Sequence, residues 1–409
     1  MWDYLKGHVI DKLRELPPES IQMVVTSPPY WGLRKYDGDQ DVIWGGAAGC
    51  EHDWAALPKV HHGGKGGEEK SKCLAGRNLA GRDSVREYQP GSFCQVCGAW
   101  RGSYGLEPSI ELYVEHTVEV LREIRRVLKP DGVVFWNIGD SYAGSGGTGT
   151  SLDNISRNPN NTPGFKSVRP HPAATGLKPK DLCLIPFRVA LAVQADGWWV
   201  RSDIIWSKPN PMPESCKDRP TRSHEYIFLF TKSQDYYWDA DAVKEPHQAS
   251  SFTRMKYGLH QKHPGGVGVG IPPIQAEKMG DLKDRFLPEG GRNMRTMWNI
   301  PDELMNIFWT WYSQQPEEFK TIWTMTTHSY KWPDQVEHFA TFPEELPRKA
   351  IKAGSRKGDT ILDPFAGSGT TLRVARDLER NAIGIDISDK YKAVGEKRAD
   401  LNTKDILGF

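Results

Sequence analysis

The spacing of apolar residues predicts an alternation of helices and short buried strands over most of the chain. Val9, Leu13 and Leu16 repeat at helical intervals before Pro17-Pro18 ends the helix, and residues 21–25 then form a buried strand. This alternation is typical of a doubly wound, mostly parallel α/β sheet. The same reasoning predicts further helices over 110–128, 184–195, 343–354, from 369 and from 390, further strands over 133–138, 198–206, 226–230, 360–363 and 382–386, and a turn at 130–132.

Three stretches interrupt this alternation. Residues 37–105 are rich in Gly, Lys and Glu with little periodicity, which indicates an insertion in the core fold. Residues 144–179 are rich in Gly, Ser, Asn and Pro and are expected to form a loop. Residues 235–330 carry scattered charges and many aromatic residues, which indicates a separate recognition region. We expect the strands at 198–206 and 226–230 to lie at an edge of the sheet.

Composition narrows the class of protein. The 409 residues suffice for one large α/β domain with insertions, or for two domains. A net charge of +1 argues against a purely electrostatic nucleic-acid binder but leaves room for a local basic cleft. Six cysteines are too few for a disulfide scaffold. No long apolar run predicts a membrane span and no signal peptide is visible, so we expect a cytoplasmic protein.

Residues 361–371 have the pattern of a nucleotide-type binding turn. Asp363 ends a strand, the small residues 366–369 follow, and a helix begins there. Glycines let the backbone approach a ligand closely, and the helix start presents free N–H groups. Asp386 ends the next strand, where an acid can bind ribose hydroxyls. The turn has neither Gly-x-Gly-x-x-Gly nor a Walker lysine, which favours a zwitterionic nucleoside such as S-adenosylmethionine. The alternative is a tight turn without a ligand.

Residues 26–30, Thr-Ser-Pro-Pro-Tyr, follow the first buried strand and suit chemistry on an exocyclic amino group. Such amines are poor nucleophiles because their lone pair is delocalised into the base. The Ser27 hydroxyl and the Pro28 carbonyl can accept the amino hydrogens and expose the lone pair, and the prolines preorganise the backbone. Tyr30 offers a ring on which an extruded base can stack. The alternative is a strand that simply ends at prolines.

Together the two motifs resemble those of the β-class of DNA amino-methyltransferases, in which the catalytic motif precedes the cofactor motif. The resemblance covers about residues 5–35, 106–235 and 334–400. It implies a Rossmann-like S-adenosylmethionine-dependent methyltransferase fold with a circularly permuted motif order. Residues 338–346 resemble the segment that closes over the methionine part of the cofactor. The chain departs from the family at Phe342, where a lysine or similar polar residue is usual, at Gly7-His8, where Gly-Asp is frequent, and in the large insertion after Tyr30.

The resemblance implies methyl transfer from S-adenosylmethionine to a flipped base in double-stranded DNA. Serine at the first position of the catalytic motif favours cytosine N4, with adenine N6 as the alternative. An RNA methyltransferase, a small-molecule methyltransferase and a catalytically silent nucleic-acid-binding module are the remaining alternatives. A homodimer and a separately acting cognate restriction endonuclease are further expectations. The expected catalytic residues are Ser27, Pro28, Pro29 and Tyr30, and the expected cofactor-binding residues are Thr26, His338, Ala340, Phe342, Pro343, Asp363, Pro364, Phe365, Gly367, Ser368, Gly369, Thr370, Thr371, Asp386 and Ile387.

The insertion carries a pattern of metal ligands. Cys94 and Cys97 have the spacing of a metal knuckle, and Cys50 and His52 can supply the other two ligands of a tetrahedral zinc. A polar segment of this length cannot easily bury a core, so a structural Zn²⁺ would fold it. The alternatives are free thiols, or one ligand place taken by another residue of the insertion, which are Cys73, His61 and His62.

These observations divide the chain into four regions. Residues 1–36 and 106–234 form the catalytic half of the methyltransferase domain, 37–105 the zinc-binding insertion, 235–333 the target-recognition region and 334–409 the cofactor-binding half. In the recognition region tryptophans and basic side chains can contact DNA, although core packing explains most of the tryptophans better. These residues are Trp238, Trp298, Trp309, Trp311 and Trp323 with Arg254, Lys256, Lys262, Arg285, Arg292 and Arg295. Arg219, Arg222, His224 and Glu225 lie near the flipped base by resemblance, or on a solvated turn.

Overall fold

An eight-stranded mixed sheet organises the computed structural model, which describes residues 2–32, 41–54, 92–143, 176–208, 211, 214, 216–247, 291–299 and 342–400. The strand order across the sheet is β1-β10-β9-β2-β5-β7-β6-β8. A second sheet pairs β3 with β4. The strands are β1 (Trp2–Lys6), β2 (Ile21–Thr26), β3 (Val42–Trp44), β4 (Trp100–Gly102), β5 (Leu128–Ile138), β6 (Trp199–Ser207), β7 (His224–Thr231), β8 (Met297–Asn299), β9 (Thr360–Asp363) and β10 (Asn381–Asp386).

Every strand of the large sheet except β7 runs in the same direction, which confirms the predicted mostly parallel α/β sheet. The pairs from β1 to β5 are all parallel, β7 is antiparallel to β5 and β6, and β8 is parallel to β6. The carboxyl ends of β2, β5, β9 and β10 therefore share one edge of the sheet. The antiparallel β7 begins at that edge, where Tyr226 lies opposite Ile138.

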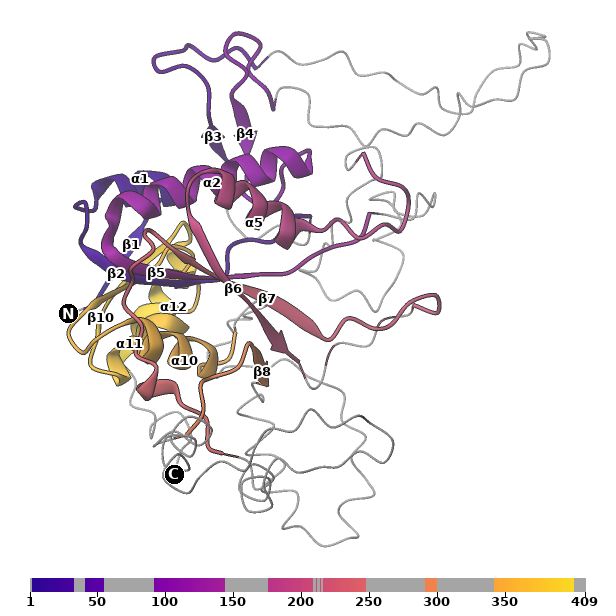
Figure 1. Ribbon diagram of the computed structural model, residues 1–409. Coiled ribbons are helices and arrows are strands. Elements are labelled where there is room, and N and C mark those ends of the chain that lie inside the picture. Colours follow the sequence, from indigo (N-terminus) through magenta and orange to yellow (C-terminus); the bar gives the residue numbers. More distant parts are fainter. Residues whose placement is uncertain are drawn as a thin grey trace, which may run out of the picture.

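Helices cover both faces of the sheet (Figure 1). One layer holds α1, α2 and α5, and the other holds α10, α11 and α12. Among the described residues, no helix is both long and apolar enough to cross a membrane. The helices are α1 (Val9–Glu15), α2 (Ile110–Val127), α5 (Ile185–Ala195), α10 (Glu345–Gly354), α11 (Thr370–Asp377) and α12 (Asp389–Asp400), with a short 3-10 helix η1 (Asp241–Val243).

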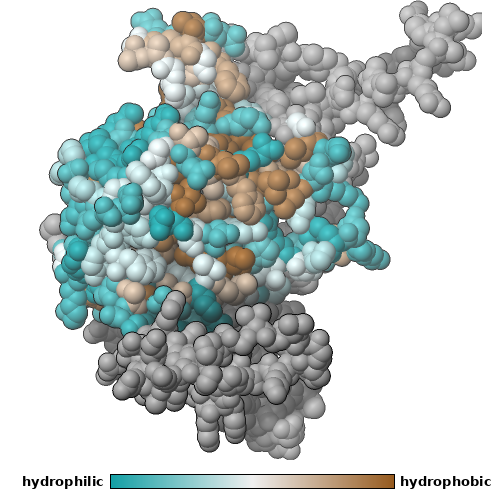
Figure 2. Space-filling model, viewed as in Figure 1, coloured by the Kyte–Doolittle hydropathy of each residue, from teal (hydrophilic) through white to brown (hydrophobic). Residues whose placement is uncertain are grey.

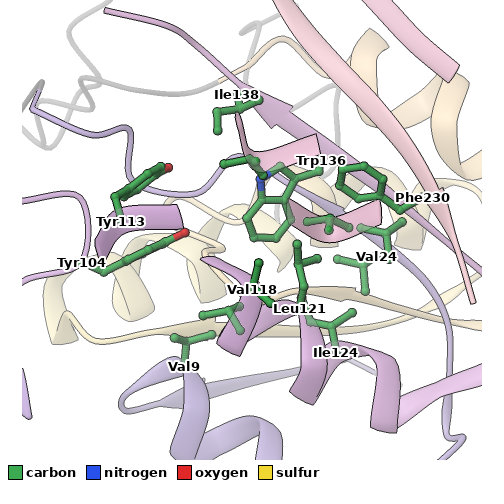
Figure 3. Close-up of a cluster of buried hydrophobic side chains, with 14 of the residues drawn as sticks. Val9, Val24, Tyr104, Tyr113, Val118, Leu121, Ile124, Trp136, Ile138 and Phe230 are labelled. Atoms are coloured by element: carbon green, nitrogen blue, oxygen red, sulfur yellow. The ribbon is translucent and has the colours of Figure 1, made fainter. Parts of the chain in front are cut away.

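Alternating side chains of the central strands divide the core into two clusters. Val24 and Trp136 pack under α1 and α2 with Phe230, as Figure 3 shows, whereas Met23 and Phe135 face α10 and α11. All five side chains are fully or almost fully buried. Burying one such side chain stabilises the fold by about 1.5–3 kcal/mol, so the central strands that end at the two predicted motifs are firmly held.

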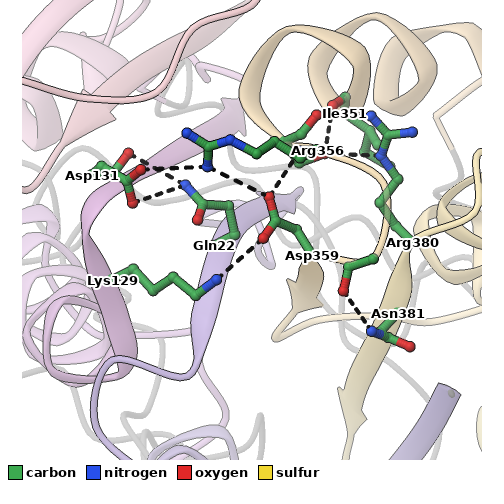
Figure 4. A network of polar contacts seen from close by, with 10 residues as sticks. Gln22, Lys129, Asp131, Ile351, Arg356, Asp359, Arg380 and Asn381 are labelled. Carbon is green, nitrogen blue, oxygen red and sulfur yellow. Dashed lines mark hydrogen bonds and ion pairs between the residues drawn. The ribbon is translucent and has the colours of Figure 1, made fainter.

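The sheet is also tied together by a polar network at the edge opposite those motifs (Figure 4). Lys129 Nζ contacts Asp359 at 3.2 Å, and Gln22 Nε2 donates to Asp131 Oδ1 at 3.2 Å. Arg356 lies between both carboxylates, at 3.6 Å from Asp131 and 4.0 Å from Asp359. The network joins the amino ends of β2, β5 and β9. It therefore holds these strands in register at the edge opposite the two motifs.

Several elements differ from the sequence predictions. The predicted turn at 130–132 is wrong, because β5 begins at Leu128 and accommodates Pro130 in an irregular pairing with β2. The strand at 198–206 is not at the edge, because β8 pairs outside it. Strands β1, β3, β4 and β8 lack a clear periodic signal and were not predicted.

Candidate functional site

The two predicted motifs meet at the carboxyl edge of the sheet. Strands β2 and β9 are neighbours, with Val24 opposite Leu362. Thr26 Oγ1 donates a hydrogen bond to Asp363 Oδ1 at 2.6 Å, and Thr371 Oγ1 donates to Asp363 Oδ2 at 2.7 Å. Asp363 is buried and also accepts the Phe365 N–H, so it joins the ends of both strands and the start of α11. It therefore holds the site together rather than facing a ligand.

Ser27 and Tyr30 belong to one hydrogen-bonded cluster. Ser27 Oγ donates to the Tyr30 hydroxyl at 3.1 Å, and the Tyr30 hydroxyl donates to Glu225 Oε2 at 2.7 Å. Asn137 Nδ2 donates to the Tyr30 hydroxyl at 2.8 Å and lies 3.2 Å from the same Glu225 oxygen. Lys208 Nζ pairs with the other Glu225 oxygen. The four strands β2, β5, β6 and β7 thus each bring a polar group, on or just after the strand, to the same point.

The Pro29-Tyr30 segment is packed between two glycines. The Tyr113 hydroxyl donates to the Pro29 carbonyl at 3.0 Å. A Cβ added at Gly139 would lie 2.7 Å from Tyr30 Cε2, and one added at Gly105, whose φ is +90°, would lie 3.0 Å from Pro29 Cβ. No larger side chain fits at either place without displacement. The Tyr30 ring is therefore seated directly on the backbone that follows β5.

Asn137, Lys208 and Glu225 are site residues that the predicted catalytic set omitted. Glu225 was considered only as a neighbour of the flipped base or as part of a solvated turn; its bonds to Tyr30 and Lys208 rule out the solvated turn. Their place in the strands could have identified them. Asn137 and Lys208 lie at or just after the carboxyl ends of β5 and β6, and Glu225 lies at the start of the antiparallel β7. Nearby, the Arg222 guanidinium lies 3.7 Å from the buried Asp140 carboxylate.

The predicted cofactor turn is held by hydrogen bonds between its backbone and the side chains of Asp386 and Tyr4. Gly367 N–H donates to Asp386 Oδ2 at 3.0 Å and Ser388 N–H donates to Asp386 Oδ1 at 2.8 Å. The Tyr4 hydroxyl donates to the Gly367 carbonyl at 2.5 Å. Gly369 precedes α11 with φ +75°, a left-handed conformation that glycine adopts without strain. A Cβ there would meet the backbone of Gly395 at 3.0 Å.

Burial raises the pKa of both acids at this turn. The pKa of Asp363 rises to about 6, and hydrogen bonds from Thr26, Thr371 and Phe365 limit the rise. The pKa of Asp386 also rises to about 6 because of burial, against the bonds from Ser388 and Gly367. Both carboxylates are therefore largely ionised at neutral pH. The Gly367 and Ser388 N–H groups each bond to one Asp386 oxygen, and a backbone hydrogen bond from Ile387 adds to them. A carboxylate has about four acceptor sites, so it can still accept a further donor.

The other predicted cofactor residues fall into four groups. Phe365 is half-buried beside Tyr104 and Trp136, at ring distances of 5.5 and 6.2 Å. Phe342 packs against the core cluster under α10 and α11, and its neighbour Pro343 is half-buried. His338 and Ala340 lie outside the described residues. The remaining residues, Pro364, Ser368, Thr370 and Ile387, lie within the turn or just after β10, and the first three are buried.

Four residues of the insertion form a candidate metal centre. The ligand atoms of Cys50, His52, Cys94 and Cys97 all lie within 4.8 Å of one another. Cys50 Sγ is 3.9 Å from Cys94 Sγ, and His52 Nδ1 is 3.4 Å from Cys97 Sγ. A tetrahedral zinc with bonds of about 2.0–2.3 Å needs ligand separations of roughly 3.3–3.8 Å. The described cluster contains neither of the alternative histidines nor Cys73, which lie outside the described residues.

Hydrogen bonds lower the pKa of Cys94 and Cys97 and raise that of Cys50. Burial acts to raise the pKa of Cys94, but bonds from the Cys97 and Val96 backbone and from His52 lower it to about 6. The Gly98 N–H donates to the Cys94 carbonyl at 3.0 Å and closes the turn between the second pair of ligands. Thiolate donors with backbone N–H bonds are typical ligands of a structural metal ion.

The recognition region is described only in part. Arg292 and Arg295 both pair with Glu245, at 3.1 and 2.9 Å, which orders that segment and engages both guanidinium groups. Trp298 is 1% exposed and Trp238 packs on Phe135, so both tryptophans belong to the core, as preferred. Outside the described residues lie Trp309, Trp311, Trp323, Arg254, Lys256, Lys262 and Arg285.

Comparisons with known proteins agree on one family. The family described as DNA methylase, of the N6/N4 type, matches residues 21–397. The type II methyltransferase M.SmaI of Serratia marcescens is 33% identical over 392 residues, covering 96% of this chain and 88% of the relative. M.Cfr9I of Citrobacter freundii, also a type II methyltransferase, is 32% identical over 402 residues, covering 98% and 89%. The solved cytosine-N4-specific PvuII DNA methyltransferase aligns with a TM-score of 0.49 and 17% identity, over 99% of this chain and 89% of that one.

Proposed function

The chain belongs to the N6/N4 family of DNA amino-methyltransferases, and from this premise we propose that it methylates the N4 atom of cytosine in double-stranded DNA. The enzyme is a DNA methyltransferase dependent on S-adenosylmethionine. The target base is the proposed part, and Ser27 at the first position of the catalytic motif supports it. Adenine N6 is the alternative within the same family.

The observation that carries the site proposal is the bond between Thr26 and Asp363, which brings the catalytic and cofactor turns together. We propose Ser27, Pro28, Pro29 and Tyr30 as the catalytic residues. Ser27 Oγ and the Pro28 carbonyl accept the two amino hydrogens and direct the nitrogen lone pair away from the base ring. The Tyr30 ring stacks on the extruded base. Such preorganised acceptors need no rearrangement during the reaction.

The cofactor turn fits S-adenosylmethionine by its donors and acceptors. When bound, the cofactor supplies an electrophilic methyl group to the amino nitrogen. The Asp386 carboxylate can accept a ribose hydroxyl, and Gly367, with φ +49°, places no side chain between the turn and a ligand. We propose the full predicted cofactor set for this role, except that Asp363 acts by holding the turn. The order of the motifs supports a circularly permuted methyltransferase fold.

The test is methyl transfer from labelled S-adenosylmethionine to mixed genomic DNA, followed by mass spectrometry of the nucleosides. We expect N4-methylcytosine, and at least a hundredfold loss of product for Ser27→Ala with cofactor binding retained. N6-methyladenine alone would overturn the choice of base. Transfer to RNA but not to DNA would favour an RNA methyltransferase, and cofactor binding without transfer to either would favour a silent binding module.

We propose that Cys50, His52, Cys94 and Cys97 hold a structural Zn²⁺. The donor set and the separations of 3.4 and 3.9 Å support tetrahedral coordination. Its role is to order the insertion, because the strands β3 and β4 are only three residues long. Elemental analysis of protein purified without added metal tests this: we expect one zinc per chain, and about none in Cys94→Ser/Cys97→Ser.

The division of the chain into four regions remains a proposal, with 235–333 as the target-recognition region. Exchange of residues 235–333 for the matching segment of M.SmaI would change the DNA sequence that is protected and leave the methylated atom unchanged. A change of the methylated atom instead would show that base choice resides there.

We propose that the chain protects DNA from a separate endonuclease. The support is that M.SmaI and M.Cfr9I are named as type II methyltransferases.

We further propose a homodimer. Figure 2 shows apolar residues gathered over α5, where Phe187 and Leu191 are 37% and 66% exposed, and a second copy would cover them. Sedimentation equilibrium gives the mass, and a monomer at micromolar concentration would overturn the dimer.

A further inference from the structure

Two tryptophans pack the metal-bearing hairpin against the core. This hairpin is the β3–β4 pair with the proposed zinc ligands Cys50, His52, Cys94 and Cys97. Trp44 of β3 and Trp100 of β4 lie opposite each other and are buried, at 3% and 5% exposure. Both rings stack on the imidazole of His116 in α2, at 4.4 Å and 19° for Trp44 and 5.4 Å and 26° for Trp100. In Figure 1 the hairpin stands on the outer side of α2. His116 is therefore one of the points at which the insertion contacts the methyltransferase domain, together with His8, whose ring meets Trp44 at 4.7 Å.

The imidazole of His116 also contacts a buried glutamate, Glu107. Its Nδ1 lies 3.1 Å from Glu107 Oε1, and the two side chains are 6% and 0% exposed. Glu107 Oε2 accepts the Gly105 N–H at 2.9 Å, and the Glu107 carbonyl accepts the Trp31 Nε1–H at 3.0 Å. Burial raises the pKa of Glu107, so these hydrogen bonds offset only part of the cost of burying its carboxylate, and the loss of one partner would increase that cost.

The segment around Gly105 packs against Pro29 and Tyr30 of the proposed catalytic turn. The Gly105 carbonyl accepts the Gly32 N–H at 2.8 Å. A Cβ at Gly105 would lie 3.2 Å from the Tyr30 carbonyl oxygen as well as touching Pro29. The strand β4 runs directly into this segment, so any movement of the hairpin displaces the residues against which Pro29 and Tyr30 rest.

We propose that the metal-bearing hairpin supports the catalytic turn, and that Glu107 and His116 are positioning residues that connect the two. The proposal rests on the proposed methyl transfer and on the proposed zinc. With the metal bound, Trp44 and Trp100 hold His116, His116 holds Glu107, and Glu107 fixes Gly105 beneath Pro29. Without the metal the short hairpin loses its closure, and the catalytic turn loses the packing of the Gly105 segment.

The first test follows the backbone of the turn rather than the reaction. Hydrogen exchange of the intact protein is compared before and after removal of zinc by a chelator, and again after ZnCl₂ is added back. We expect faster exchange in the peptide covering residues 24–32, which contains the Gly32 N–H, and reversal by zinc. The peptide covering residues 345–354, which form α10 on the other face of the sheet, is the control and should not change. Unchanged exchange in residues 24–32 after zinc loss would overturn the proposal.

The second test keeps the metal and breaks the connection. Glu107→Ala should lower kcat by tenfold to a hundredfold with zinc content and the Kd for S-adenosylmethionine unchanged, because misplacement of a catalytic group by about 1 Å can cost a hundredfold. Glu107→Gln keeps an oxygen for the Gly105 N–H and an amide that can reach His116, so it should recover most of the rate. Ile43→Ser, on the exposed side of β3, is the matched control and should match the wild type.

The outcomes separate the two proposals. If Glu107→Ala retained wild-type kcat, the connection would be wrong even though methyl transfer stood. If the wild-type protein transferred no methyl group to any nucleic acid, the proposed function would fail, and the exchange of residues 24–32 would still decide whether the hairpin supports the turn. If Glu107→Ala did not fold, the chelation experiment on the unaltered chain would decide.

Discussion

Thr26 Oγ1 donates a 2.6 Å hydrogen bond to Asp363 Oδ1, across 337 residues of sequence. Both residues end central strands, and both are buried. The bond therefore fixes the position of the catalytic turn, which begins at the next residue, relative to the cofactor turn. In the proposed site, methyl transfer needs the amino nitrogen and the methyl carbon in line and close together, so this bond is part of the proposed reaction geometry.

Replacement of Thr26 by valine should weaken the connection between the ends of β2 and β9. Valine keeps the shape of threonine but donates no hydrogen bond, so Asp363 Oδ1 retains only the Phe365 N–H. We expect the free energy of unfolding to fall by about 1.5–3 kcal/mol, the range for a bond to a charged group. Urea unfolding measures it. Thr26→Ser keeps the hydroxyl and is the control; an equal loss in serine and valine variants would contradict the role of the bond.

Replacement of Gly139 by alanine should displace the Tyr30 ring. The added methyl group would lie 2.7 Å from Tyr30 Cε2, closer than carbon atoms approach without movement. We expect kcat to fall at least tenfold while the Kd for S-adenosylmethionine stays within twofold. Steady-state kinetics and calorimetry measure the two quantities. A variant with normal kcat would show that the position of the Tyr30 ring is not limiting.

Loss of the Glu225 carboxylate should release the Tyr30 hydroxyl. Glu225 accepts from Tyr30 at 2.7 Å and is itself held by Lys208. We expect Glu225→Ala to lower kcat tenfold to a hundredfold with little effect on cofactor affinity. Glu225→Gln still offers an acceptor to Tyr30 and should recover part of the rate. Equal rates for the glutamine and alanine variants would mean that the charge, rather than the bond to Tyr30, matters.

The raised pKa of Asp386 should make stability depend on pH. Its pKa is about 6 in the folded protein against an ordinary 3.8, so the folded state binds more protons between these values. The free energy of unfolding contributed by this group therefore decreases as pH rises from about 4 to 6. Relative to Asp386→Asn, the wild type should lose at most about 3 kcal/mol over that interval. Urea titrations at several pH values give the difference; a constant difference would contradict the raised pKa.

The same group should govern cofactor binding in acid. An ionised Asp386 offers more acceptor lone pairs to ribose hydroxyls than its protonated form. We expect the affinity for S-adenosylmethionine to fall as pH drops through about 6, and to be weaker and less pH-dependent in Asp386→Asn. Calorimetry from pH 5 to 7.5 measures this. A wild-type affinity that rises on acidification would exclude the ribose role.

Elements with strong periodicity were predictable from the sequence. The helix over α2 and the strands β2, β9 and β10 agree to within about two residues, because apolar spacing and flanking Pro or Gly define them. The strand β1 was not predicted because Trp2–Lys6 alternates weakly and gains its place only by pairing with β10. The boundary of β5 was wrong because Pro130 signals a turn, yet tertiary pairing continues the strand past it.

The site was predictable where chemistry is local. Each of the two proposed turns is a continuous stretch of sequence, although 337 residues separate them, and the cluster of Cys50, His52, Cys94 and Cys97 follows from a knuckle spacing. Asn137, Glu225 and Lys208 are distant in sequence and join the turn only through strand register. Their identities carry no motif, so only the folded sheet reveals them.

The pairing of β1 with β10 places Trp2 opposite Ala382. Trp2 and Ala382 are 380 residues apart, and β10 is the only strand that pairs with β1 among the described residues. Because synthesis runs from β1 to β10, this pair can form only after the whole stretch between the two strands has been made, and the long separation makes its formation a slow step. Until then β1 lacks its strand partner, and an unpaired strand is a risk for aggregation.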